Sequence, residues 1–241
     1  MKRKAPAHPV PSKTIFLFDV DNTLLDNDRI TADLKQHLEK EVGREGSRSF
    51  WNIFERLRNK LGYADYLGAL QRYRMENPRD PRLIAVSHFL IDYPFAKRLF
   101  PGSLKVLQRV RRWGQVVIFS DGDVVFQPRK IKQSGLSKAV GGSVLIYVRK
   151  DRMLKDVAER FPAHHYVLVD DKLRILSAVK KTWGRRVTTV FVRQGHYAFD
   201  PKILSRYPAP DVSIGSIRVL LNFDLIKFTA WAKIAKGRES D

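Results

Sequence analysis

The chain has 241 residues, and 44% of them are hydrophobic, which is enough for a substantial core and excludes a globally disordered protein. It contains no cysteine, so disulfides, cysteine nucleophiles and thiolate metal sites are excluded. Lysine and arginine outnumber aspartate and glutamate by 45 to 25, giving a net charge of +20 that favours anionic partners such as phosphorylated metabolites. No apolar run approaches the ~20 residues of a membrane span. We therefore expect a cytoplasmic protein with no membrane partner.

The two ends of the chain differ from the rest in composition. Residues 1–12 combine a lysine and arginine cluster with three prolines and lack the apolar core of a secretory signal, which predicts a basic, disordered tail. Contact between such a basic arm and nucleic acid stays an open alternative. Residues 223–241 are expected to form a C-terminal helix or tail.

The first chemically notable stretch follows this tail. The apolar run Ile15 to Phe18 is rich in β-formers and too short for a helix, so it predicts a buried strand. Asp19 and Asp21 come directly after it, at the end where open α/β sheets bind ligands. Two carboxylates held this close repel each other, so we expect a cation nearby.

Residues 29–99 have a helical pattern. Apolar residues recur at helical spacing in four segments, which end at Gly43, Gly62, Asn77 and Pro94. No strand pattern is evident in this range. It therefore predicts an all-helical insertion after the first strand.

The pattern changes again near residue 100. Four apolar runs, at 115–119, 144–148, 166–169 and 187–192, alternate with helical segments, and a short last strand is expected at 211–214. Such alternation is typical of an α/β fold with a doubly wound parallel sheet. Residues 13–28 and 100–222 are therefore predicted to form one core domain.

Polar residues follow four of the predicted strands. Ser120, Lys150 and the pair Asp170 and Asp171 join Asp19 at the edge where a parallel sheet opens to ligand. Carboxylates are hard oxygen ligands that suit Mg²⁺. A lysine and a metal ion could neutralise a phosphoryl group, a serine hydroxyl could hold its oxygens, and an aspartate could attack phosphorus.

These residues together resemble the haloacid dehalogenase-type (HAD) hydrolases over residues 13–221. The resemblance rests on four motifs: Phe18 to Leu25 (FDVDNTLL), Ser120, Lys150, and Val169-Asp170-Asp171. Lys150 precedes Asp170 by 20 residues (170 − 150), as the family usually shows, with Arg149 and Lys155 as weaker candidates. The family's fold implies a Rossmann-like core, with the helical insertion as a cap over the site.

The resemblance implies a role for each matching residue. Asp19 would be the nucleophile and a metal ligand, and Asp21 would transfer protons and bind the metal through its backbone carbonyl. Asp170 and Asp171 would complete the Mg²⁺ site. Ser120 and Lys150 would be catalytic and bind the phosphoryl group, with Thr23, Asp121 and Gly122 as further substrate contacts.

The implied function is a Mg²⁺-dependent phosphatase that hydrolyses a small phosphorylated metabolite through an aspartyl-phosphate. In the family's dehalogenases the second aspartate of the first motif is typically replaced, so Asp21 favours phosphoryl chemistry. A phosphomutase and a catalytically silent module that binds nucleic acid or protein are the alternatives. Asp121, Asp151 and Ile175 depart from the family pattern, and the oligomeric state is left open.

Candidate residues for substrate recognition lie in the insertion and after the fifth strand. Tyr63, Tyr66, Arg72 and Arg74 could recognise an anionic or planar leaving group, although solvated helix residues need no such role. His196 follows a strand at the ligand end of the sheet and could contact the substrate or the cap.

Overall fold

The computed structural model describes residues 12–223, and it contains a six-stranded parallel sheet in the order β3-β2-β1-β4-β5-β6. The tail predicted for residues 1–12 and the segment 223–241 lie outside this range, apart from one residue of each. The strands are β1 (Ser12–Phe18), β2 (Gln115–Asp121), β3 (Val144–Tyr147), β4 (Ala163–Asp170), β5 (Val187–Val192) and β6 (Val212–Ile214). This sheet confirms the predicted fold class.

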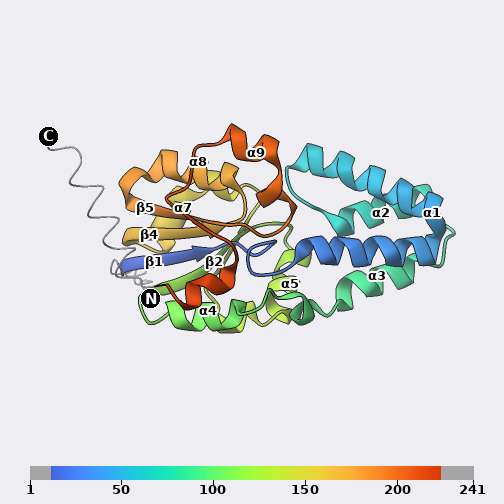
Figure 1. Ribbon diagram of the computed structural model, residues 1–241. Helices are drawn as coiled ribbons and strands as arrows, with labels where there is room; N and C mark the ends of the chain where they lie inside the picture. The colour runs from blue at the N-terminus through green and yellow to red at the C-terminus, as the bar shows by residue number, and fades with distance from the viewer. Residues whose placement is uncertain (1–11, 224–241) are drawn as a thin grey trace, which may run out of the picture.

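Helices cover both faces of the sheet (Figure 1). Phe16 and Phe18 of β1 pack in one apolar cluster with α4 (Ser103–Val110), α5 (Phe126–Gln133) and α6 (Leu136–Ala139). Ile15 and Leu17 belong to a second cluster, with α7 (Leu154–Arg160) and α8 (Leu173–Trp183). Successive side chains of a strand point to opposite faces, so a strand buried on both faces must be apolar at every position. This requirement explains the uninterrupted apolar run before Asp19.

Short elements connect these layers. They are η1 (Phe95–Arg98), η2 (Lys150–Arg152), η3 (Gly184–Arg186), η4 (His196–Phe199), α9 (Pro201–Arg206) and η5 (Ile217–Leu221). Gly184 caps the C-terminus of α8, and its φ of 53° is a conformation that glycine adopts readily.

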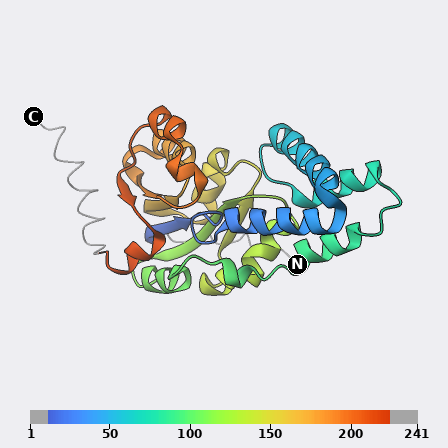
Figure 2. The same cartoon turned by 45° about the vertical axis from the view of Figure 1, so that its right-hand side comes forward.

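Between β1 and β2 the chain forms the predicted helical cap, which extends to one side of the sheet (Figures 1 and 2). It consists of α1 (Asn27–Leu61), α2 (Tyr66–Glu76) and α3 (Leu83–Asp92). The sequence predicts a helix end at Gly43, and the chain there leaves helical geometry (φ 79°, ψ 172°) and then resumes a helix. α1 is therefore kinked at Gly43, and its two halves form separate arms of the cap. Gly62 ends the second arm in the left-handed conformation.

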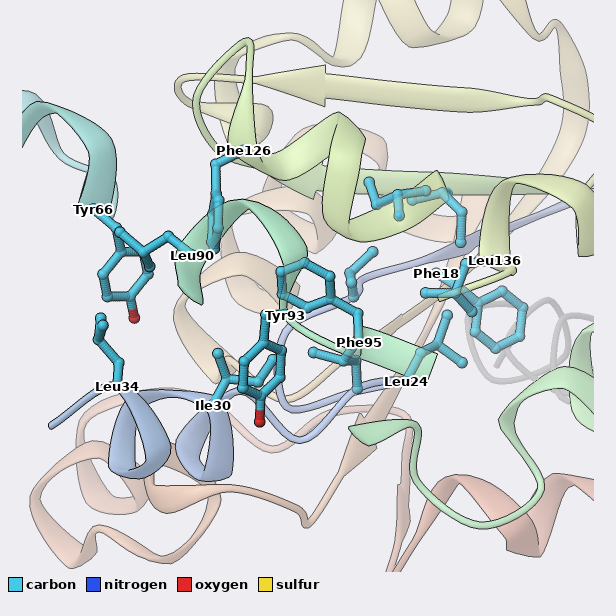
Figure 3. Close-up of a cluster of buried hydrophobic side chains, with 14 of the residues drawn as sticks. Phe18, Leu24, Ile30, Leu34, Tyr66, Leu90, Tyr93, Phe95, Phe126 and Leu136 are labelled. Carbon is cyan, nitrogen blue, oxygen red and sulfur yellow. The ribbon is translucent and has the colours of Figure 1, made fainter. Parts of the chain in front are cut away.

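One apolar cluster continues from the sheet into the cap (Figure 3). Phe126 of α5 lies 5.5 Å from Tyr66 of α2 and 5.6 Å from Phe95, measured between ring centroids. Leu34 of α1 and Leu90 of α3 belong to the same cluster. The cap therefore rests on the core through aromatic packing as well as through its two connecting chains.

Within residues 12–223, none of the helices combines the length and apolar character needed to cross a membrane. The expected cytoplasmic location stays a prediction.

Candidate active site

The central position of β1 brings the predicted site residues together. β1 lies between β2 and β4, with Phe18 opposite Ile118 and Val169. The Asp19 backbone N–H donates a 3.0 Å hydrogen bond to the Val169 carbonyl, which fixes Asp19 beside the end of β4. Because all strands are parallel, their carboxyl ends meet at one edge, as the sequence predicts.

Lys150 forms the electrostatic centre of this edge. Its Nζ lies 2.5 Å from Asp19 Oδ1 and 2.7 Å from Asp170 Oδ2, and its side chain is fully buried. Burial opposes ionisation of Asp19, but the charges of Lys150 and Lys172 outweigh it and lower the Asp19 pKa. For Lys150 burial also opposes the charge, and Asp170 and Asp19 outweigh it and raise the pKa. The arrangement therefore holds an ionised carboxylate beside a charged lysine.

Three buried carboxylates form a candidate metal site. Asp19, Asp170 and Asp171 each offer an oxygen within 4.8 Å of the others. Both side-chain oxygens of Asp171 are buried without a hydrogen-bond partner. Burial raises the Asp171 pKa well above its ordinary value, because Lys172 and Lys150 offset it only in part. A buried oxygen cluster with orphaned acceptors fits a hard divalent cation such as Mg²⁺.

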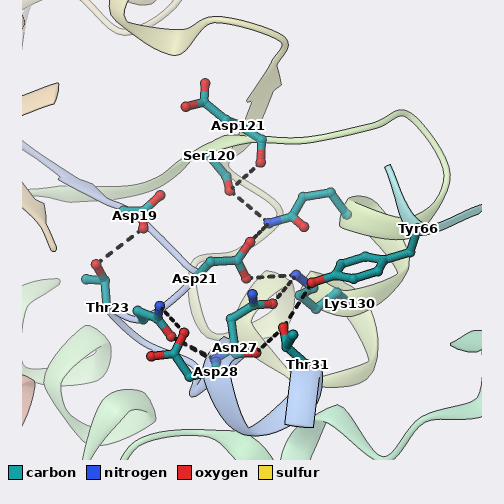
Figure 4. Close-up of polar contacts among 12 residues, drawn as sticks. Asp19, Asp21, Thr23, Asn27, Asp28, Thr31, Tyr66, Ser120, Asp121 and Lys130 are labelled. Atoms are coloured by element: carbon teal, nitrogen blue, oxygen red, sulfur yellow. Dashed lines mark hydrogen bonds and ion pairs between the residues drawn. The ribbon is translucent and has the colours of Figure 1, made fainter. Parts of the chain in front are cut away.

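Asp21 lies near Asp19, and its carboxylate accepts hydrogen bonds from side chains of α5 (Figure 4). Its Oδ1 accepts a 2.8 Å hydrogen bond from Lys130 Nζ, and its Oδ2 accepts a 3.3 Å bond from Gln127 Nε2. Lys130 Nζ also donates to Asn27 Oδ1 at 3.0 Å. The second carboxylate of the first motif is thus held in place by side chains that the sequence did not single out.

The remaining predicted residues support the turn at the strand ends. Thr23 Oγ1 donates a 3.3 Å bond to Asp19 Oδ2, and Ser120 Oγ accepts a 2.9 Å bond from Gln127 Nε2. Asp121 Oδ1 accepts the Lys150 backbone N–H at 2.6 Å, and the Gly122 N–H donates to the Tyr147 carbonyl at 2.9 Å. Thr23 and Gly122 therefore have protein partners, and their substrate contacts stay predictions.

A cavity of about 1070 Å³ lies between the cap and the core. Asp21, Asp121 and Gly122 line it on the core side. The buried residues that do not line it are Asp19, Ser120, Lys150, Asp170 and Asp171. On the cap side Tyr63 and Tyr66 line the cavity, and Arg72 and Arg74 do not. The cavity therefore borders the first motif directly at Asp21.

The loop after β5 contacts the base of the cap and also lines the cavity. His196 Nδ1 lies 2.6 Å from Asp28 Oδ1, and the neighbouring Tyr197 hydroxyl accepts a hydrogen bond from Arg58 of α1. Asn22 Nδ2 donates a 2.9 Å hydrogen bond to the same Asp28 carboxylate. The backbone of Asn22 has a positive φ of 62°. The loop with His196 therefore joins the turn after β1 to the cap. The cap is one of the two contacts predicted for His196, and the substrate is the other.

Lys130, Gln127 and Lys172 are the site residues that sequence reasoning missed. Lys172 directly follows the paired acids and lines the cavity. Burial opposes its charge, but Asp171 and Asp19 outweigh burial and raise its pKa. Its position next to the fourth motif was an available signal, whereas nothing in the order of residues links α5 to Asp21.

Comparisons with known proteins agree with this geometry. A family model described as haloacid dehalogenase-like hydrolase matches residues 13–181, so the chain belongs to this family. A structure of a protein from Burkholderia xenovorans, assigned as a haloacid dehalogenase-like hydrolase, is 60% identical, covers 89% of this chain and 100% of its own, and has a TM-score of 0.85. No curated protein matches the sequence.

More distant structures share the fold alone. The HAD-hydrolase YfnB from Bacillus subtilis, solved with bound magnesium, is 15% identical over 88% of this chain and 98% of its own, with a TM-score of 0.57. An L-2-haloacid dehalogenase from Xanthobacter autotrophicus is 16% identical over 89% and 98%, with a TM-score of 0.55. The family match and the 60% identical structure identify the protein as a HAD-like hydrolase.

Proposed function

We propose that this protein is a Mg²⁺-dependent phosphatase that hydrolyses a small phosphomonoester through an aspartyl-phosphate on Asp19. The observation that supports this most is Asp21. It provides a second carboxylate two residues after the nucleophile, at the wall of the cavity. Phosphoryl transfer to Asp19 needs such a group to move a proton to the leaving oxygen, whereas loss of a halide needs none.

The first step begins with the ionised Asp19 carboxylate. Lys150 holds Asp19 Oδ1 at 2.5 Å, which leaves Oδ2 as the oxygen that attacks phosphorus. Thr23 bonds to Oδ2 at 3.3 Å, so the attacking atom is oriented but only weakly held. The Ser120 hydroxyl and the charge of Lys172 are the nearby groups that could bind phosphoryl oxygens.

The groups that would hold Mg²⁺ are the carboxylates of Asp19, Asp170 and Asp171 and the backbone carbonyl of Asp21. A bound Mg²⁺ would neutralise phosphoryl charge that these three acids otherwise repel. Lys150 already pairs with Asp19 and Asp170, so Asp171 is the carboxylate whose oxygens most need a cation.

The net charge of +20 supports an anionic substrate, and a small phosphorylated metabolite fits the cavity. Nucleic acid, bound through the same charge, is the alternative partner.

A substrate panel separates phosphatase activity and nucleic-acid binding from dehalogenation. Aryl and alkyl phosphates, with L-2-chloropropionate as the halide-releasing substrate, are assayed with Mg²⁺ and with a chelator. We expect phosphate release that requires Mg²⁺ and no halide release. Halide release alone, or salt-sensitive nucleic-acid binding without turnover, would contradict the proposal.

A further inference from the structure

Two side chains of α5 hold the Asp21 carboxylate from opposite ends, and we call Gln127 and Lys130 the α5 clamp. Lys130 Nζ lies 2.8 Å from Oδ1, and Gln127 Nε2 lies 3.3 Å from Oδ2. Residues three positions apart lie on the same face of a helix, so one helix can present both donors to one carboxylate. Together they fix the plane of the carboxylate as well as its position.

Stability alone does not account for this clamp. The Lys130 side chain is only 2% exposed, while that of Asp21 is 23% exposed. Removing an ammonium from water is costly, and an apolar residue of similar volume is often as stable or more stable at such a position. A buried lysine on the proton-transfer carboxylate therefore points to a role in the chemistry.

The surroundings of the α5 clamp fit such a role. Gln127 Nε2 also donates to Ser120 Oγ at 2.9 Å, which links Asp21 to a residue predicted to bind phosphate. A Cβ on Gly122 would come within 2.6 Å of Gln127 Cβ and Cγ, so glycine at this position makes room for the clamp. Lys130 binds Asn27, the first residue of α1, and thereby connects Asp21 to the base of the cap (Figure 4).

We propose that Lys130, assisted by Gln127, is a positioning residue for proton transfer in the hydrolysis of the aspartyl-phosphate. This inference rests on the proposed phosphatase function. Lys130 binds Oδ1 closely, which leaves the more weakly held Oδ2 to accept the proton. The ammonium and the amide both donate hydrogen bonds, so α5 orients both oxygens of the Asp21 carboxylate.

Water hydrolyses the aspartyl-phosphate in the step that Lys130 assists. The oxygen of water bonds to phosphorus while the bond between phosphorus and the Asp19 oxygen breaks, and its electron pair stays on the Asp19 carboxylate. One proton of the water passes to Asp21 Oδ2, and in the next cycle it goes to the leaving oxygen. The products are inorganic phosphate and the free Asp19 carboxylate.

The test uses 4-nitrophenyl phosphate, because its leaving group departs as an anion without needing a proton. In Lys130→Met we expect kcat to fall about 10- to 100-fold, because the Asp21 carboxylate is misplaced for proton transfer. The ratio kcat/KM reports the earlier phosphoryl transfer and should stay within about 3-fold of the wild type. Acid-quenched samples should contain more phosphorylated enzyme than the wild type. Lys130→Arg should recover part of kcat, and Lys132→Met, an exposed lysine of the same helix, should behave as the wild type.

Equal losses in kcat and kcat/KM, or no accumulation of phosphorylated enzyme, would overturn the positioning role while leaving the phosphatase function intact. If the wild type hydrolyses no phosphate ester, both the proposed function and this inference fail. Melting curves identify a variant that does not fold. In that case Gln127→Leu, which removes the weaker donor, replaces it and should show the same split with a smaller loss of kcat.

Discussion

The strand-end site and the helical cap hold their charged groups in different ways. At the strand ends a fully buried Lys150 bridges two carboxylates that come from two strands. In the cap, ion pairs such as Arg58 with Glu55 are partly exposed, with side-chain exposures of 39% and 53%. Breaking a buried pair is strongly destabilising, whereas an exposed pair contributes little to stability. The effects of substitutions should therefore decrease from the strand ends to the cap.

The largest effect is expected at Asp19. Asp19→Asn keeps the shape of the side chain and removes the nucleophilic charge, so kcat should fall by about 10⁴-fold or more. Phosphate release in the presence of Mg²⁺ measures the loss. An active Asp19→Asn variant would remove the reason to place the chemistry at the strand ends.

The next effect concerns stability. Lys150→Met leaves Asp19 and Asp170 without their buried cation, which should lower the free energy of unfolding by about 3–5 kcal/mol. Denaturant unfolding measures it, and Asp170→Asn added to Lys150→Met should recover part of the loss. Lys155→Met, at a lysine with a 92% exposed side chain, serves as the control and should unfold as the wild type.

Metal binding gives a third test of the buried site. Mg²⁺ at a concentration of about 100 times its Kd should stabilise the protein by about 2.7 kcal/mol, because it binds only the folded chain. Thermal melts with Mg²⁺ and with a chelator measure this shift. Asp171→Asn should remove it, and Glu159→Gln, at an exposed acid, should retain it. A full shift in Asp171→Asn would place the cation elsewhere.

The smallest effect is expected in the cap. Arg58 lines the cavity and donates to the Tyr197 hydroxyl, so Arg58→Met should weaken contact between cap and core. When binding is lost equally in the ground and transition states, KM rises and kcat is unchanged. For Arg58→Met we expect KM to rise by about a few-fold. Steady-state kinetics tests this, with Arg56→Met, at an exposed residue of the same helix, as the control. A large fall in kcat would show that the cap shares in the chemistry.

The same contrast explains what could be predicted from the sequence. Asp19, Lys150 and Asp170 were predictable because each follows an apolar run, and parallel strands end at one edge. Lys130 was not, because its contact with Asp21 depends on how α5 packs, and 109 residues separate the two. In α2 the sequence could not tell which face looks into the cavity, so Tyr66 and Arg72 were equal candidates, and only Tyr66 lines it.

Gly43 is a second position where the sequence predicts the structure only in part. A glycine after an apolar repeat predicts a helix end, and the backbone there does leave helical geometry. Whether the next helix follows at once depends on packing between the two arms of α1, which local sequence does not encode.

The most direct test of the central claim is to identify the residue that carries the phosphoryl group during turnover. Enzyme quenched in acid while it hydrolyses 4-nitrophenyl phosphate is digested and analysed by mass spectrometry. We predict one phosphoryl group on the peptide that contains Asp19, and none in Asp19→Asn. A phosphoryl group on Ser120, or turnover with no modified Asp19, would contradict the account.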